Sequence, residues 1–166
     1  MTRFELSYEP PLDWPALLAF LQRRAAAGVE FVDDTTYRRT ATFGNSVGVL
    51  EVSRAETPGR LSVSVSESLS AHKDELSKRL RRLFDLDLSP RSMHESLGSC
   101  EELGDIVASI PGLRAPGAWE GLEIGVRAIV GQQRAANLDH YPPGSGQLRA
   151  HLVIRSVRVH SRTYVT

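Results

Sequence analysis

The sequence of 166 residues has a single cysteine, no long apolar run and no excess of either charge. Because Cys100 is alone, an internal disulfide and metal sites built from several cysteines are excluded. No apolar run approaches the roughly 20 residues needed to cross a bilayer. The first six residues lack the apolar core of a secretory signal. The sequence therefore predicts a cytoplasmic protein with no membrane partner.

Charged residues balance over the whole chain but not over its parts. Residues 1–133 hold 15 Lys and Arg against 19 Asp and Glu, a net charge of −4. Residues 134–166 hold 5 Arg and one Asp, a net charge of +4. Affinity for DNA comes largely from neutralisation of phosphates. The first 133 residues are therefore expected to bind DNA weakly or not at all by themselves.

Helical and strand patterns alternate along the first part of the chain. Asp13 is placed to cap a helix with an apolar stripe, and Gly28 is a suitable stop. Gly44-Asn45 predicts a hairpin turn between two strands. Successive hairpins require antiparallel pairing, so the sheet is expected to be mainly antiparallel. The strand candidates are an edge strand around Phe4, Leu6 and Tyr8, then Val29–Val32, Tyr37–Phe43, Ser46–Val52 and Arg60–Ser66.

Helical spacing returns near Ala71, where apolar residues recur on one face. Ser89-Pro90 predicts the start of a second helix that ends near Gly98. The inward residues of the first helix are Leu76, Leu80, Leu83 and Phe84. A third helix is expected at Glu101–Ser109, with Leu103, Ile106, Val107 and Ile110 inward. The order of elements predicts an α+β fold over residues 1–112, an antiparallel sheet with flanking helices.

Residues 114–133 have the pattern of an amphipathic helix that no later segment covers. Gly131 is expected to end it as a C-terminal cap. Its apolar face comprises Trp119, Leu122, Val126, Ile129 and Val130. An uncovered stripe at residues 119–130 marks a partner surface or an aggregation liability. After Gln133 the period is lost, so residues 134–166 are predicted to form an irregular tail with one weak strand candidate, Val157–His160.

Three segments resemble AlkA-type 3-methyladenine DNA glycosylases II, in the same order along the chain. They are Tyr-Glu-Pro-Pro-Leu-Asp-Trp at residues 8–14, Arg-Leu-Phe-Asp-Leu-Asp at 82–87, and Pro-Gly-Leu-Arg-Ala-Pro-Gly-Ala-Trp-Glu at 111–120, followed by Val-Arg-Ala-Ile-Val-Gly-Gln-Gln at 126–133. The resemblance covers about residues 4–133. It implies an N-terminal sheet domain at 1–112 and the first helix of a helical glycosylase domain at 113–133. It also implies base excision from alkylated double-stranded DNA by nucleotide flipping, without a cofactor.

The resemblance transfers two site positions and no catalytic group. Phe20 matches an aromatic residue that helps to line the base pocket, and the alternative is a core aromatic on an amphipathic helix. Gln133 matches the residue that wedges into the DNA beside the flipped nucleotide, and the alternative is a polar residue beyond a helix end. The family's helix-hairpin-helix motif and catalytic aspartate lie after the position of Gln133. No catalytic residue is therefore assigned.

The remaining reactive residues form no recognisable site. The basic run Lys73–Arg82 offers phosphate contacts, but its spacing favours the solvated face of a helix. Asp85 and Asp87 have no third ligand nearby, which favours capping or surface roles over a metal site. The five histidines lack metal-ligand spacing, and Cys100 has no evident base partner.

Three functional hypotheses follow from the sequence. The first is a truncated or frame-shifted AlkA-like glycosylase whose residues act as scaffold without excising bases alone. The second is a non-catalytic interaction module that self-associates through residues 119–130. The third is direct, salt-sensitive DNA binding through the basic residues 134–166.

Overall fold

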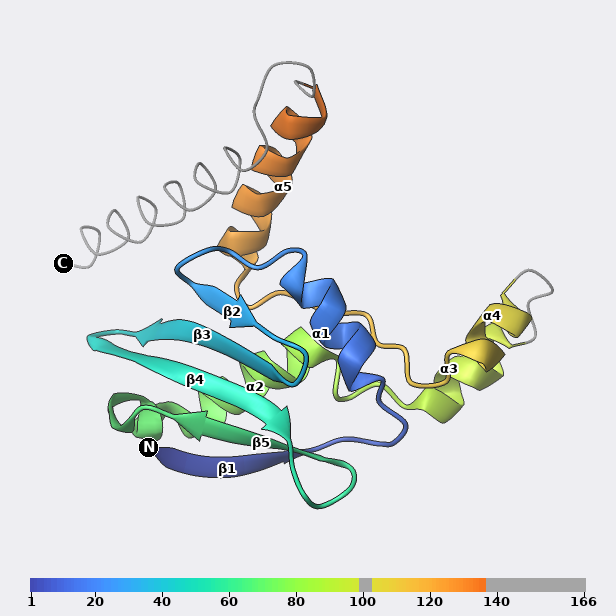
Figure 1. The fold of residues 1–166 in the computed structure, drawn as a ribbon, viewed down its shortest axis with the longest axis horizontal. Coiled ribbons are helices and arrows are strands. Elements are labelled where there is room, and N and C mark those ends of the chain that lie inside the picture. The colour runs from blue at the N-terminus through green and yellow to red at the C-terminus, as the bar shows by residue number, and fades with distance from the viewer. Residues whose placement is uncertain (99–102, 137–166) are drawn as a thin grey trace.

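The computed structural model describes residues 1–98 and 103–136, which form an antiparallel sheet with helices on one face (Figure 1). Cys100 and most of the expected tail, residues 137–166 with the strand candidate Val157–His160, lie outside the described residues. The elements are β1 (Thr2–Ser7), α1 (Trp14–Gln22), β2 (Glu30–Val32), β3 (Thr36–Phe43), β4 (Ser46–Arg54), β5 (Arg60–Val65), the 3-10 helix η1 (Glu67–His72), α2 (Lys73–Phe84), α3 (Pro90–Leu97), α4 (Gly104–Ser109) and α5 (Gly121–Ala136).

The five strands pair in the order β1-β5-β4-β3-β2, and every pairing is antiparallel. The predicted edge strand is confirmed, because β1 pairs only with β5 among these strands. The predicted hairpin joins β3 and β4, and Gly44 adopts the positive φ of 55° that its turn requires. In β5, Leu61, Val63 and Val65 are buried while the serines between them are half-exposed. This alternation gives the sheet one packed face and one wet face.

The packed face carries the core of the domain. Helices α1 and α2 lie over this face (Figure 1). Phe84 at the end of α2 is fully buried, and its ring meets Trp14 of α1 and Tyr37 of β3 edge-on, with centroids 5.1 and 5.4 Å apart. Edge-to-face pairs of this kind are favourable beyond the area that they bury. The three rings therefore connect both helices to the sheet.

Side chains at the helix ends confirm two predicted starts and correct one predicted stop. The Asp13 carboxylate accepts from the Ala16 amide at 3.0 Å, and the Ser89 hydroxyl accepts from the Ser92 amide at 3.4 Å. Helix α1, however, ends at Gln22 instead of continuing to Gly28. The Ala26 amide is bound by the Glu30 carboxylate at 2.9 Å, so it is not available to a longer helix. Gly28 has a positive φ of 74° in the following turn.

Helices α3 and α4 lie beside each other, away from the sheet (Figure 1). The predicted third helix begins only at Gly104, and two of its expected inward residues are exposed, Leu103 by 41% and Ile110 by 36%. The inward assignment was wrong for these two residues, because helices α3 and α4 project beyond the core instead of packing on it. Among the described residues no helix is long and apolar enough to span a bilayer.

Candidate functional site at the junction between the sheet and α5

Residues 111–120, which we call the junction segment, run between α4 and α5 against the ends of α1 and α2. The Asp13 amide donates to the Gly112 carbonyl at 2.8 Å, and the Gly117 amide donates to the Leu83 carbonyl at 3.1 Å. A Cβ atom on Gly112 would lie 2.5 Å from the Asp13 nitrogen, and one on Gly117 would lie 2.4 Å from the Arg82 carbonyl oxygen. The segment approaches backbone so closely that only glycine fits at these two points.

Arg114 anchors the middle of the junction segment with a buried guanidinium. Its Nη2 donates to the carbonyls of Glu9 at 2.6 Å and Pro11 at 3.0 Å. Its Nη1 donates to the carbonyls of Leu88 at 2.5 Å and Asp85 at 3.5 Å. The three segments that carry the sequence resemblance therefore meet around the Arg114 side chain. Of the four carbonyls that it binds, only that of Leu88 lies outside these segments, one residue after the second.

Trp119 is buried, with 3% of its surface exposed. Its ring lies against the guanidinium groups of Arg39 and Arg79, 4.2 and 5.5 Å from the ring centroid, and its carbonyl accepts from Arg82 at 3.1 Å. The prediction that Trp119 belongs to an uncovered helical stripe is therefore wrong. Helix α5 begins at Gly121, so the helical spacing does not extend back to this residue.

Four charged side chains form the junction charge cluster between the sheet and α5: Glu30, Arg39, Glu123 and Arg127. Arg39 contacts Glu30 at 3.4 Å and Glu123 at 3.0 Å, and Arg127 contacts each of these carboxylates at 2.5 Å. The Tyr37 hydroxyl donates to Glu30 at 2.7 Å. The Arg39, Glu30 and Glu123 side chains are only 0%, 6% and 9% exposed. Two cations thus balance two anions out of contact with most of the solvent.

The charges within this cluster stabilise one another. Burial opposes ionisation of Glu30, but the adjacent Arg39 and Arg127 outweigh it and hold the pKa of this carboxyl below its usual value. Burial likewise works against the charge of Arg39, yet Tyr37, Glu123 and Glu30 raise its pKa. Burial also raises the pKa of Tyr37. Glu30, Arg39 and Arg127 therefore remain ionised at neutral pH, which suits a structural connection rather than proton transfer.

Acid is expected to release α5 before the sheet unfolds. Because the pKa of Glu30 is lowered on folding, its contribution is present above the ordinary value of 4.5 and is lost as the pH falls below that value through the lowered pKa. The chain has two tryptophans. The indole NH signal of Trp119 should therefore shift below pH 4.5, while that of Trp14, bonded to Thr35, remains. Simultaneous loss of both signals would contradict this order.

The two positions assigned by resemblance lie on the elements that meet here. Phe20 of α1 is half-buried against the core, with the Arg24 guanidinium 3.7 Å from its ring centroid. Gln133 lies within α5, so its interpretation as a residue beyond a helix end was wrong, and its side chain lies outside the described structure. The helix also continues through Gly131 rather than ending there. A glycine inside a helix costs only about 1 kcal/mol, too little to stop it.

The structure brings the end of α1 and helix α5 together through Arg127, which donates to the Arg24 carbonyl at 2.6 Å. The junction charge cluster was not predicted from the sequence. Glu123 and Arg127 do have the i, i+4 spacing of a helical ion pair. Nothing in that local spacing indicates Glu30 or Arg39 as their partners.

Two arginines of the basic run on α2, Arg79 and Arg81, make contacts within the domain. Arg79 pairs with Glu75 at 3.0 Å and Glu120 at 3.5 Å. Arg81 pairs with Asp87 and donates to the Ser7 carbonyl. Lys73, Lys78 and Arg82 are exposed, so the predicted solvated face is confirmed, and arginines on this face also make contacts within the domain. The capping and surface roles of the two aspartates are confirmed, because Asp85 caps α2 with a φ of 53°. In the described residues no group of three or more acidic, histidine or cysteine side chains is arranged to hold a metal.

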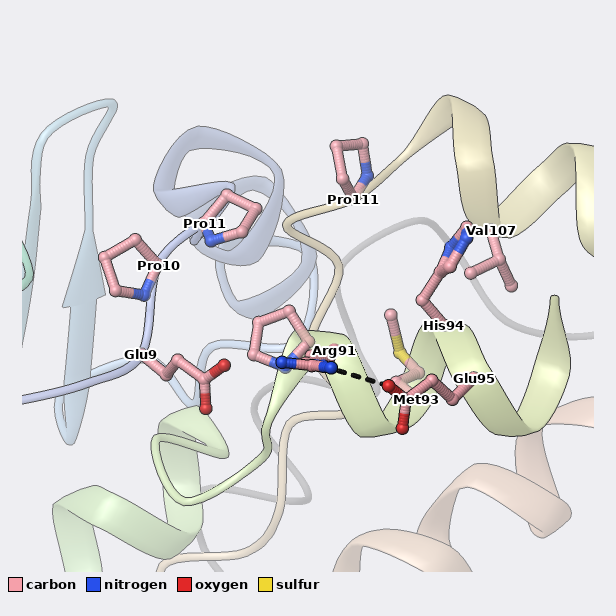
Figure 2. Close-up of a pocket in the computed structure, with 10 residues that line it drawn as sticks. Glu9, Pro10, Pro11, Arg91, Met93, His94, Glu95, Val107 and Pro111 are labelled. Carbon is pink, nitrogen blue, oxygen red and sulfur yellow. Dashed lines mark hydrogen bonds and ion pairs between the residues drawn. The ribbon is translucent and has the colours of Figure 1, made fainter.

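A groove lies between the Pro10-Pro11 turn and the α3–α4 pair (Figure 2). This groove has a volume of about 480 Å³. Arg91 and Glu95 on its rim pair with each other at 2.9 Å. It is lined by Glu9, Pro10, Pro11, Pro90, Arg91, Met93, His94, Glu95, Val107 and Pro111. Its charges are mixed and do not converge on one point, so the junction remains the stronger candidate site.

The fold and the junction define an antiparallel sheet domain against which helix α5 is held by the junction charge cluster. A family model for the AlkA N-terminal domain matches residues 3–120, and the chain belongs to this family. It is 37% identical over 129 residues to DNA-3-methyladenine glycosylase 2 of Escherichia coli, covering 78% of this chain and 44% of that protein.

A second curated protein and a solved structure are also similar to this chain. The chain is 32% identical over 130 residues to a probable bifunctional transcriptional activator/DNA repair enzyme AlkA of Mycobacterium tuberculosis, covering 77% of this chain and 25% of that protein. The fold is similar to that of a 3-methyladenine DNA glycosylase from Archaeoglobus fulgidus, with a TM-score of 0.66, 14% identity, and coverage of 91% of this chain and 48% of that one. The chain thus spans less than half the length of each of these proteins.

Proposed function

We propose that residues 1–136 are the structural part of an AlkA-like DNA-3-methyladenine glycosylase, which removes alkylated bases from double-stranded DNA in base excision repair. In this proposal residues 1–112 are the sheet domain, and the helix expected at 113–133 is α5 with the junction segment before it. The protein acts in the cytoplasm without a cofactor. Phe20 lines the base pocket and Gln133 occupies the position of the DNA wedge.

The observation that supports this proposal most is the docking of α5 on the sheet domain. Arg114, Trp119 and the junction charge cluster hold α5 through contacts that bury charged and aromatic groups. The similarity to the Escherichia coli enzyme extends into this helix, because an alignment of 129 residues must reach at least residue 129 of this chain. A similarity that reaches this far supports a sheet domain that carries the first helix of a glycosylase domain.

The contacts of three acidic residues support the proposed scaffold role. Glu30 and Glu123 are neutralised by arginines, and Asp85 caps a helix, so none of these acids is poised to assist cleavage of a glycosidic bond. We therefore propose that this chain alone neither excises bases nor binds DNA tightly. Excision depends on the helix-hairpin-helix motif and aspartate that the family carries after the position of Gln133.

A base-release assay on methylated double-stranded DNA tests the proposal. It compares the chain itself with the same chain extended by the C-terminal domain of the Escherichia coli relative. Only the extended protein is expected to release 3-methyladenine. Release by the chain alone would place a catalytic group within it, and a folded but inactive extended protein would contradict the glycosylase function.

Self-association through α5 is a second candidate function. Leu122, Ile124 and Ile129 are 58%, 50% and 59% exposed, and Leu122 and Ile129 lie about two turns apart on one side of the helix. Sedimentation velocity over a range of concentrations should show a discrete dimer that disappears in the Leu122→Gln/Ile129→Gln variant. Val47→Gln, at a 55% exposed position on the sheet, is the matched control. A monomer, or polydisperse association, would reject the module.

A further inference from the structure

Arg127 connects helix α5 to two segments that lie 103 and 97 residues away in the sequence. Its Nη1 donates to the carbonyl of Arg24, just after α1, at 2.6 Å. Its Nη2 contacts the carboxylates of Glu30 on β2 and Glu123 on α5, each at 2.5 Å. A guanidinium presents its donors in one plane and in fixed directions. Contacts in several directions at once therefore define both the rotation and the axial position of α5.

Arg127 also lies between the two positions assigned by resemblance, Phe20 on α1 and Gln133 on α5. Arg24 accepts from Arg127 through its carbonyl and covers the Phe20 ring with its own guanidinium, 3.7 Å from the ring centroid. Gln133 follows Arg127 by six residues, about 9 Å along the helix axis. A rotation or slip of α5 would move the backbone at Gln133 relative to the Phe20 ring.

We propose that Arg127 is a positioning residue, which holds α5 against the end of α1 so that Phe20 and the backbone at Gln133 keep one relative placement. This inference rests on the proposed function for the part that Phe20 and Gln133 play in base removal. The contacts to Glu30 and to the Arg24 carbonyl carry it, because the Glu123–Arg127 pair alone lies within one helix and cannot orient that helix against the sheet.

Hydrogen exchange of α5 amides in the 166-residue chain tests the positioning directly. Arg127→Met, Arg127→Lys and Glu30→Gln should each raise the exchange of α5 amides by about tenfold or more relative to β4 amides. Lysine is not expected to rescue, because a single ammonium group does not reproduce the planar set of contacts. Glu30→Gln leaves the pair within α5 in place. If this variant leaves α5 exchange unchanged, Arg127 stabilises only its own helix and the proposal fails.

Arg91→Met is the matched control for the exchange experiment. It also removes an i, i+4 ion pair, with Glu95 at 2.9 Å, but both side chains are exposed, by 83% and 62%. Exchange of α5 amides should not change in this variant. An increase equal to that of Arg127→Met would show a general response to charge removal and would overturn the inference.

Base release by the extended protein distinguishes two roles of Arg127, positioning α5 for base removal and only stabilising the fold. Arg127→Lys should lower the single-turnover rate by about 10- to 100-fold and leave the dissociation constant for DNA within about twofold. An unchanged rate together with faster α5 exchange would show that Arg127 only stabilises the fold. If the unaltered extended protein releases no base, the proposed function fails. The exchange data alone then decide whether Arg127 holds α5.

Discussion

Replacing Arg39 with alanine is expected to lower the free energy of unfolding by about 3–5 kcal/mol. The Arg39 side chain is fully buried and contacts both carboxylates of the junction charge cluster. Its removal leaves Glu30 and Glu123 in a poorly solvated site with Arg127 as their remaining cation. The loss is a large part of the total stability of about 5–15 kcal/mol of a typical domain. Urea denaturation followed by circular dichroism measures it.

Arg38→Ala provides the control at the neighbouring position. Arg38 points to the wet face of the sheet, where it pairs with Glu51, and the two side chains are 45% and 38% exposed. Exposed pairs contribute about 1 kcal/mol or less, so this variant should remain close to the unaltered chain. An Arg39→Ala effect no larger than that of Arg38→Ala would mean that the junction charge cluster is effectively solvated.

Phe84→Ala is expected to destabilise the domain to a similar extent, by about 3–5 kcal/mol. The ring is fully buried between Trp14 and Tyr37, and its removal leaves a cavity where α1, α2 and the sheet meet. Thermal or urea unfolding measures the effect. Phe84→Leu should cost less, because leucine fills more of that cavity than alanine does.

Phe31→Ala is the control for Phe84→Ala. It removes an aromatic ring that lies outside the core, so it shows what the loss of a ring alone costs. Phe31 lies on β2 with 57% of its surface exposed, near Arg38 at 5.6 Å. Its replacement should change the free energy of unfolding by about 1 kcal/mol or less. Equal effects of the two alanine variants would contradict the packing described for Phe84.

Much of the sheet domain was predictable because its signals are local. Alternation of apolar and polar residues indicated the strands to within one or two residues, and Gly44-Asn45 indicated the hairpin. Asp13 and Ser89 marked helix starts because a cap needs only the amides of the next turn. The resemblance correctly indicated the family and its fold, although it showed only the order of the three segments and not their meeting point at Arg114.

The candidate site was less predictable, because its contacts join residues far apart in the chain. The resemblance selected Phe20 and Gln133, and their roles remain predictions. Arg39, Glu123 and Arg127 received no role from their spacing. A buried arginine has the same local pattern as an exposed one, as the adjacent residues Arg38 and Arg39 illustrate with 45% and 0% exposed side chains.

The sequence by itself determined the strands, the turn and the helix starts, since each depends on residues within about one turn or one hairpin of one another. The tertiary structure decided where α1 ends and that Trp119 is buried. It also decided which oppositely charged side chains pair in the junction charge cluster. The deciding pairs are 84 residues apart for Arg39 and Glu123, 103 for Arg127 and Arg24, and 105 for Arg114 and Glu9. No local pattern contains such pairs, because they form only when the folded sheet brings the two ends of the domain together.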